Sequence, residues 1–104
     1  MNAEYGADDP RGIVDLDAQT RVKLFDWIGE AFVADRRELD TLSSYQLKHA
    51  FEAEQNVYVT NGHFKGAMLL CGFYPTHADN QNWLFKVRTT RELPQPGQPR
   101  RSSG

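Results

Sequence analysis

The chain has 104 residues, of which 39% are hydrophobic and 12% aromatic, enough for one small globular domain with tails. A single cysteine, Cys71, excludes an internal disulfide and is typical of a reducing compartment. No apolar run approaches the roughly 20 residues that a membrane-spanning helix needs, and the first ten residues are too acidic and polar for a secretory signal peptide. We therefore expect a cytoplasmic protein that does not enter a membrane.

The net charge of −2 is unevenly distributed along the chain. Residues 1–41 carry ten acidic and five basic side chains, whereas residues 42–91 carry three acidic and five basic ones. The second part therefore has a modest positive field. This field is weaker than the strongly basic surface that is typical of nucleic-acid-binding domains.

The first third of the chain predicts a loose lead, one helix and a loop. Residues 1–14 are polar and rich in glycine, proline and aspartate, which predicts a flexible N-terminal lead. Asp17 is a suitable N-cap for a helix that would run to about Ala34. The apolar face of this helix comprises Leu24, Phe25, Ile28, Ala31 and Phe32. The mixed-charge run over residues 35–40 predicts a solvated helix end followed by a loop.

Start and stop signals mark two more helices. Ser43 and Gln46 have the spacing of a capping box at the start of a helix over residues 44–55. Thr60 is the expected cap of the following helix, and Gly72 is the expected left-handed residue after its end. The buried stripe of this third helix comprises Phe64, Ala67, Met68 and Cys71. We therefore expect Cys71 to be a core residue.

A strand is predicted after the third helix. In residues 83–88, the alternating side chains Trp83, Phe85 and Val87 are expected to face the core, and Lys86 and Arg88 to point to solvent. The β-rich connection over residues 56–59 separates the second and third helices, and residues 57–59 are the candidate pairing partner. The two strands would form a small β wing.

These elements predict an α+β fold that is mostly helical. We expect a three-helix, helix-turn-helix-like domain over residues 15–91, with a two-stranded wing as in winged-helix proteins. Residues 92–104 are rich in Pro, Arg and Ser and are expected to form a disordered tail. The predicted core comprises Leu24, Phe25, Ile28, Phe32, Leu47, Phe51, Phe64, Met68 and Phe73.

The central part of the sequence is similar to a known family. Residues 44–49 and 58–73 resemble the "SYxLKH … YVxNGxFKxAMLxxGF" core of a short uncharacterised family of phages and mobile elements, and residues 82–83 and 85–87 extend the likeness. The resemblance implies a small phage or prophage accessory protein with a helix-turn-helix-like fold. It implies no activity and no site residues.

The sequence carries no pattern that is typical of an enzyme. His63 and Cys71 lie eight residues apart on one predicted helix, about 12 Å along its axis, which is too far for proton transfer. The histidines lack tight zinc-ligand spacing, and no second cysteine is present. No phosphate-binding glycine loop or paired-carboxylate motif occurs. We therefore expect a non-enzymatic protein without a metal or another cofactor.

The outer side of the third helix predicts either a contact with duplex DNA or an ordinary solvated helix face. Asn61, His63 and Lys65 cluster at the helix start, where a recognition helix presents side chains to bases, and Gly66 would let a backbone come close. Lys86 and Arg88 could add phosphate contacts. The leading hypothesis is therefore a DNA-binding regulatory module. The alternative is a protein-binding host-takeover factor that exposes an apolar patch around Leu69, Leu70, Tyr74 and Leu84. The DNA target, the host partner and the oligomeric state do not follow from the sequence.

Overall fold

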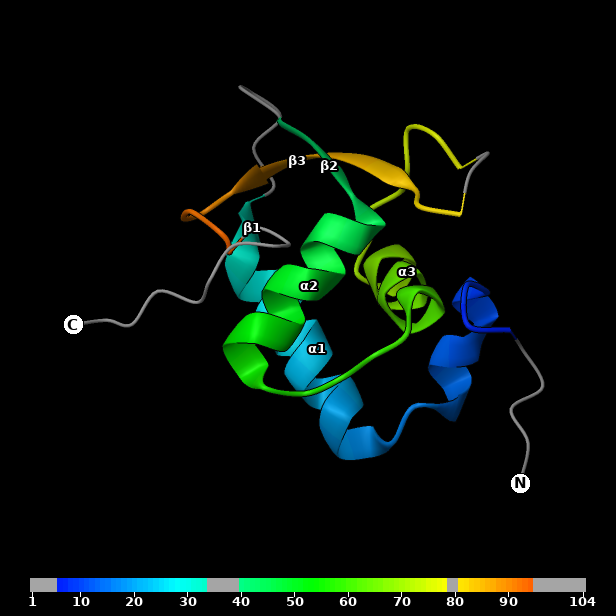
Figure 1. The fold of residues 1–104 in the computed structure, drawn as a ribbon. Helices are drawn as coiled ribbons and strands as arrows, with labels where there is room; N and C mark the ends of the chain where they lie inside the picture. The colour runs from blue at the N-terminus through cyan, green and yellow to red at the C-terminus, as the bar shows by residue number, and fades with distance from the viewer. Residues whose placement is uncertain (1–5, 34–39, 79–80, 95–104) are drawn as a thin grey trace.

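The computed structural model describes residues 6–33, 40–78 and 81–94, which form an α+β fold of helices and one antiparallel sheet (Figure 1). In chain order the elements are the 3₁₀ helix η1 (Pro10–Asp15), α1 (Ala18–Ala31), β1 (Phe32–Val33), β2 (Asp40–Ser43), α2 (Ser44–Gln55), α3 (Asn61–Leu70) and β3 (Leu84–Thr89). Figure 1 shows β2 and β3 crossing above α2 and α3, with η1 beside α3.

The predicted helix starts are confirmed. The Asp17 carboxylate accepts from the Thr20 backbone N–H at 3.0 Å, which caps α1. At the start of α2, the Ser43 hydroxyl accepts from the Gln46 N–H at 3.1 Å, and the Gln46 side chain accepts from the Ser43 N–H at 2.9 Å. The first helix ends at Ala31 rather than near residue 34, because the next two residues enter the sheet.

The end of α3 also follows the predicted signal. Gly72 has φ of +90°, and its N–H donates to the Leu69 carbonyl at 3.0 Å. The Phe73 N–H donates to the Met68 carbonyl at 2.8 Å, so the two bonds form a Schellman motif. The Phe73 ring then packs near Phe32, with ring centroids 5.5 Å apart.

The predicted two-stranded wing is wrong in its pairing. The strand expected over residues 83–88 is present as β3, but it lies at the centre of a three-stranded sheet in the order β1-β3-β2. Phe32 pairs with Thr89 on one side, and residues 40–43 pair with residues 87–84 on the other. Asp40, which the sequence assigned to a loop, begins β2. Residues 35–39 of that mixed-charge run lie outside the described residues.

The connection between α2 and α3 cannot serve as the partner strand. Asn56 ends α2 with φ of +55°, and Thr60 already caps α3. Between them, the Val59 N–H donates to a carboxylate oxygen of Glu52 at 3.0 Å. The backbone groups that a strand ladder would need are thus used to join the two helices.

The lead and the tail also need correction where the structure describes them. Residues 6–14 were expected to be loose, but η1 packs closely against α3, and Ile13 is buried in the core. In the predicted tail, Leu93 is buried as well. Residues 1–5 and 95–104 lie outside the described part of the chain.

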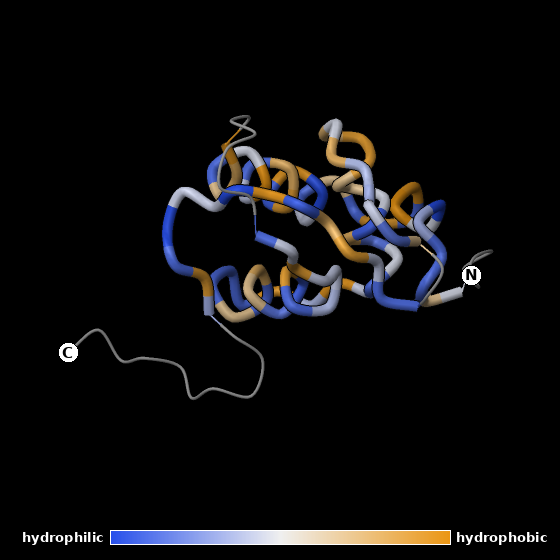
Figure 2. Tube along the Cα trace, turned by 90° about the horizontal axis from the view of Figure 1, so that it is seen from above, coloured by the Kyte–Doolittle hydropathy of each residue, from blue (hydrophilic) through white to orange (hydrophobic). Residues whose placement is uncertain are grey.

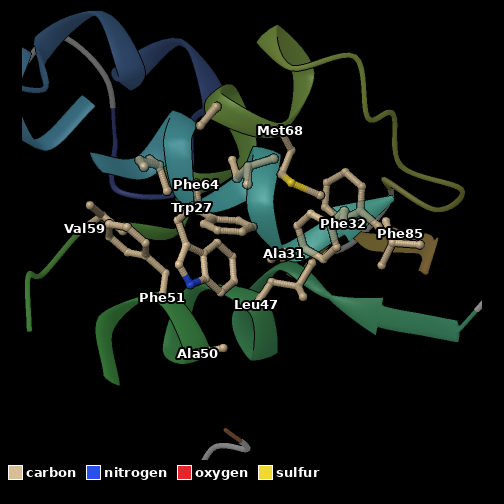
Figure 3. Packing of buried hydrophobic residues seen from close by; sticks show 14 of the residues in the cluster. Trp27, Ala31, Phe32, Leu47, Ala50, Phe51, Val59, Phe64, Met68 and Phe85 are labelled. Atoms are coloured by element: carbon tan, nitrogen blue, oxygen red, sulfur yellow. The ribbon is translucent and has the colours of Figure 1, made fainter. Parts of the chain in front are cut away.

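Trp27 lies at the centre of the hydrophobic core (Figure 3). Its indole makes edge-to-face contacts with Phe32, Phe51 and Phe64, at ring-centroid distances of 5.8, 5.7 and 6.1 Å. The predicted core is confirmed, with Phe25 and Phe73 half-buried at its margin. Along the helices, hydrophobic positions alternate with hydrophilic ones, as amphipathic packing requires (Figure 2).

One ionic contact fastens the chain after β3 to the helices. The Trp27 indole N–H donates to Glu54 Oε1 at 2.8 Å, and the Arg91 guanidinium binds both carboxylate oxygens of Glu54. Burial alone would raise the pKa of Glu54, but the hydrogen bonds from Arg91 and Trp27 outweigh it and lower that pKa below its ordinary value of 4.5.

Truncating Phe64 tests the core. Phe64 is fully buried, so Phe64→Ala should cost about 3–5 kcal/mol of unfolding free energy. Tyr58 is 72% exposed, and Tyr58→Ala should change that free energy by less than about 0.5 kcal/mol. Urea unfolding followed by circular dichroism measures both values. Equal stability of the two variants would contradict the described packing of α3.

Glu54→Gln tests the ionic contact. The glutamine keeps an acceptor for the Trp27 indole but loses its charge toward Arg91, so the melting temperature at pH 7 should fall, by roughly 1 kcal/mol or less in stability. Because the folded pKa lies below the unfolded one, wild type gains this stabilisation above about pH 4.5 and loses it as pH falls through the folded pKa. Thermal melts between pH 7 and pH 3 should therefore converge. The exposed Asp26→Asn is the control, and a difference independent of pH would refute the assignment.

Candidate binding surfaces at the two ends of helix α3

The N-terminal turn of α3 is held by a reciprocal cap. The Thr60 hydroxyl accepts from the His63 N–H at 3.0 Å, and His63 Nδ1 accepts from the Thr60 N–H at 3.2 Å. Nδ1 therefore acts as a hydrogen-bond acceptor within this cap, and that side of the imidazole is used by the helix itself. Burial lowers the pKa of His63, against a smaller opposing effect of the Asp15 charge.

Asn61 joins three segments of the chain. Its side chain is only 9% exposed, and Nδ2 lies 3.1 Å from Asp8 Oδ1, 3.0 Å from the Gln81 carbonyl oxygen and 3.0 Å from Asn82 Oδ1. Among the described residues, its own Oδ1 is buried without a hydrogen-bond partner. In this arrangement the amide cannot reach a base edge.

Lys65 is buried too, although a lysine is rarely found inside a protein. Its ammonium donates to the Asp8 carbonyl oxygen at 3.0 Å and lies 5.0 Å from the centroid of the Trp83 ring. Burial lowers the pKa of Lys65, while the nearby Asp8 and Asp9 charges act in the opposite direction. The ammonium is therefore directed at the protein itself.

Two glycines explain how the N-terminal segment, residues 6–15, comes so close to α3. A Cβ at Gly62 would overlap the Asp9 backbone, and one at Gly66 would overlap the carbonyl oxygen of Pro10. The Gly62 N–H also donates to the Ala7 carbonyl at 2.7 Å. Gly66 does admit a backbone, as its lack of a side chain suggested, but that backbone belongs to the same chain.

The five predicted DNA-binding residues thus fall into two groups. Asn61, His63 and Lys65 lie at the start of α3 beside the N-terminal segment, whereas Lys86 and Arg88 lie on β3. Phe85 and Val87 face the core, so the two basic residues between and after them project from the opposite face of the sheet. Lys86 is exposed and Arg88 half-buried.

The other end of α3 presents apolar side chains to solvent. Leu70 is 67% exposed and Tyr74 is 71% exposed, on either side of the turn at Gly72. Cys71 is exposed between them, which corrects its assignment to the buried stripe: α3 ends at Leu70, so Cys71 leaves the helical periodicity. We call Leu70, Cys71 and Tyr74, which are exposed within five consecutive residues around this turn, the apolar patch.

The sequence prediction missed the partners of its own site residues. Asp8 was assigned to the flexible lead, Trp83 to the predicted strand, and Gln81 to no element, yet each contacts a predicted site residue on α3. One signal was available. Gly62 and Gly66 are four residues apart, which places them on one helix face and indicates close approach by another backbone.

Searches for a metal site and a membrane-spanning helix in the described residues, and for similar proteins, found none. In the described ranges, no group of three or more His, Cys, Asp or Glu side chains could hold a metal ion. No helix in that part of the chain is long and apolar enough to cross a membrane. No family model, curated protein or solved structure matches the chain. The resemblance to a phage and mobile-element family stays a prediction.

Proposed function

We propose that this protein is a non-enzymatic binding module that holds a partner protein through the apolar patch. The observation that supports this most directly is the exposure of Leu70 and Tyr74, each about two-thirds or more accessible. Exposed clusters of large apolar side chains are typical of interaction sites. This is the alternative that the sequence left open, with Leu69 and Leu84 half-buried rather than protruding.

The uncharged stretch of sequence that contains the patch favours a protein over a nucleic acid as the occupant. No Asp, Glu, Lys or Arg stands between Lys65 and Asp79 in the sequence. The centres of protein interfaces are depleted in charge and enriched in tyrosine. A phosphate backbone, in contrast, requires basic side chains for its affinity. An uncharged, partly apolar surface on a partner protein is therefore the matching ligand.

A photo-crosslinking residue at position 74 tests this proposal. Position 58 is a matched control because Tyr58 is 72% exposed but has the Lys48 ammonium 5.0 Å from its ring centroid. In nuclease-treated host lysate, we expect one discrete adduct from position 74 and none of that mass from position 58. Unlabelled wild type should compete for it, whereas Leu70→Asp should compete at least about tenfold less well, since it places a charge in the patch.

Equal adducts from both positions, or equal competition by Leu70→Asp, would contradict the proposal. The same crosslink with purified protein tests whether the occupant is a second copy, which would give an adduct of twice the chain mass.

Contact with duplex DNA remains a second candidate, and one observation favours it. Lys86 and Arg88 project from the same face of β3, opposite the core. In this proposal the sheet contacts phosphates, and α2 and α3 form a helix-turn-helix-like pair beneath it. Two phosphate contacts predict weak binding, with a slope of log K against log salt concentration of about −2.

A salt titration separates the sheet from α3. Neutralising both contacts in Lys86→Ala/Arg88→Ala should lower the slope of log K against log salt concentration by about 2. Lys65→Ala should leave that slope unchanged and lower the melting temperature instead, because the ammonium is buried against Asp8. Fluorescence anisotropy with a labelled duplex measures the slope. Absence of wild-type binding at about 50 mM salt would exclude phosphate contact through the exposed sheet.

A further inference from the structure

The N-terminal segment places acidic residues against the same α3 residues that the sequence assigned to an anionic ligand. Asp8 offers its carboxylate to Asn61 and its carbonyl oxygen to Lys65. The Asp15 charge acts on His63. Two of the three residues expected to face phosphates or bases, Asn61 and Lys65, therefore bond to the acidic segment of their own chain.

The segment is seated through its backbone and through the buried side chain of Ile13. Carbonyl oxygens of residues 7 and 8 accept from Gly62 and Lys65, and the chain at Asp9 and Pro10 lies directly on the two glycines. On the α3 side, the donors are the Gly62 N–H, the Asn61 amide and the Lys65 ammonium, and the segment supplies two carbonyl oxygens and one carboxylate as acceptors. The oxygens of a phosphate backbone need the same kind of donors.

The connection to the rest of the chain permits movement. Leu16 and Asp17, between η1 and α1, are extended, with ψ of 137° and 153°. The cap of α1 depends on Asp17 and Thr20 only, so it would persist if η1 left α3. The closest packing of η1 is against α3 rather than against the sheet or α2.

We propose that residues 6–15 are an autoinhibitory segment that covers a polyanion-binding surface made of Lys65 and Asn61. When the segment leaves α3, the Lys65 ammonium and the Asn61 amide lose Asp8 as an acceptor and become available to a nucleic-acid phosphate backbone. A ligand that binds only the open state has an apparent affinity reduced by the open fraction, so the segment sets the affinity of this surface. The inference rests on the second candidate function, DNA contact, and adds that residues 6–15 regulate it.

The glycines allow the segment to be displaced without changing any charge. In Gly62→Ala/Gly66→Ala, each new methyl group would occupy the position of the segment's backbone, while alanine favours the α3 helix. Gly29→Ala is the matched control, because a Cβ at Gly29 meets nothing within 4 Å. Tryptic cleavage after Arg11 reports release, and circular dichroism reports the fold.

Binding is measured by anisotropy with a random-sequence duplex at about 50 mM salt. We expect the released variant to bind at least about tenfold more tightly than wild type and Gly29→Ala. Adding Lys65→Ala to the released variant should remove the gain. A folded, released variant with no gain would overturn the proposal.

A second variant decides the question if the double alanine variant loses its fold or keeps the segment bound. Asp8→Ala/Asp9→Ala removes the acidic groups and keeps the backbone, and Asp26→Ala/Glu30→Ala makes the same change in net charge on the exposed side of α1. The first pair should bind the duplex several-fold more tightly than the second, and equal binding would overturn the inference.

If wild type binds through Lys86 and no segment variant binds more tightly, only the autoinhibition fails. If no variant binds at all, DNA contact itself fails.

Discussion

The structure depends on the environment of one indole ring. Trp27 contacts an aromatic ring from β1, from α2 and from α3, and its N–H reaches Glu54. Because Glu54 also binds Arg91, the same side chain links the core to the segment after β3. A small domain has little stability to spare. Packing three helices and the sheet around one buried ring lets a chain of this size bury enough apolar surface to fold.

Helix α3 then separates two kinds of surface. At its start, two glycines without side chains let the N-terminal segment lie directly on the helix, and Asn61 and Lys65 become buried. At its end, the turn at Gly72 brings Leu70 and Tyr74 to solvent. The buried donors of the polar end therefore find acceptors within the chain, whereas the apolar end is left without a partner in the described structure. This contrast is the physical basis for proposing a protein ligand first.

Burying the donors at the start of α3 also costs desolvation free energy. An ammonium and an amide removed from water must find acceptors, and here Asp8 supplies two of them. One amide oxygen, Oδ1 of Asn61, finds none among the described residues. Such a surface is stable while the acidic segment remains in place and would attract other oxygen-rich ligands if it left. The autoinhibition proposal follows from this balance.

Local signals in the sequence determined the helices. Ser43, Thr60 and Gly72 act through hydrogen bonds to residues a few positions away, so their roles were predictable and are confirmed. The partners of β3 could not be predicted in the same way, because β2 pairs with it across about forty intervening residues and has a polar, four-residue sequence.

The candidate site residues were selected by the chemistry of their side chains, which the sequence shows directly. Whether Lys65 faces solvent or Asp8 depends on where residues 6–15 pack, and only the tertiary structure decides that, because the contact joins residues 57 positions apart.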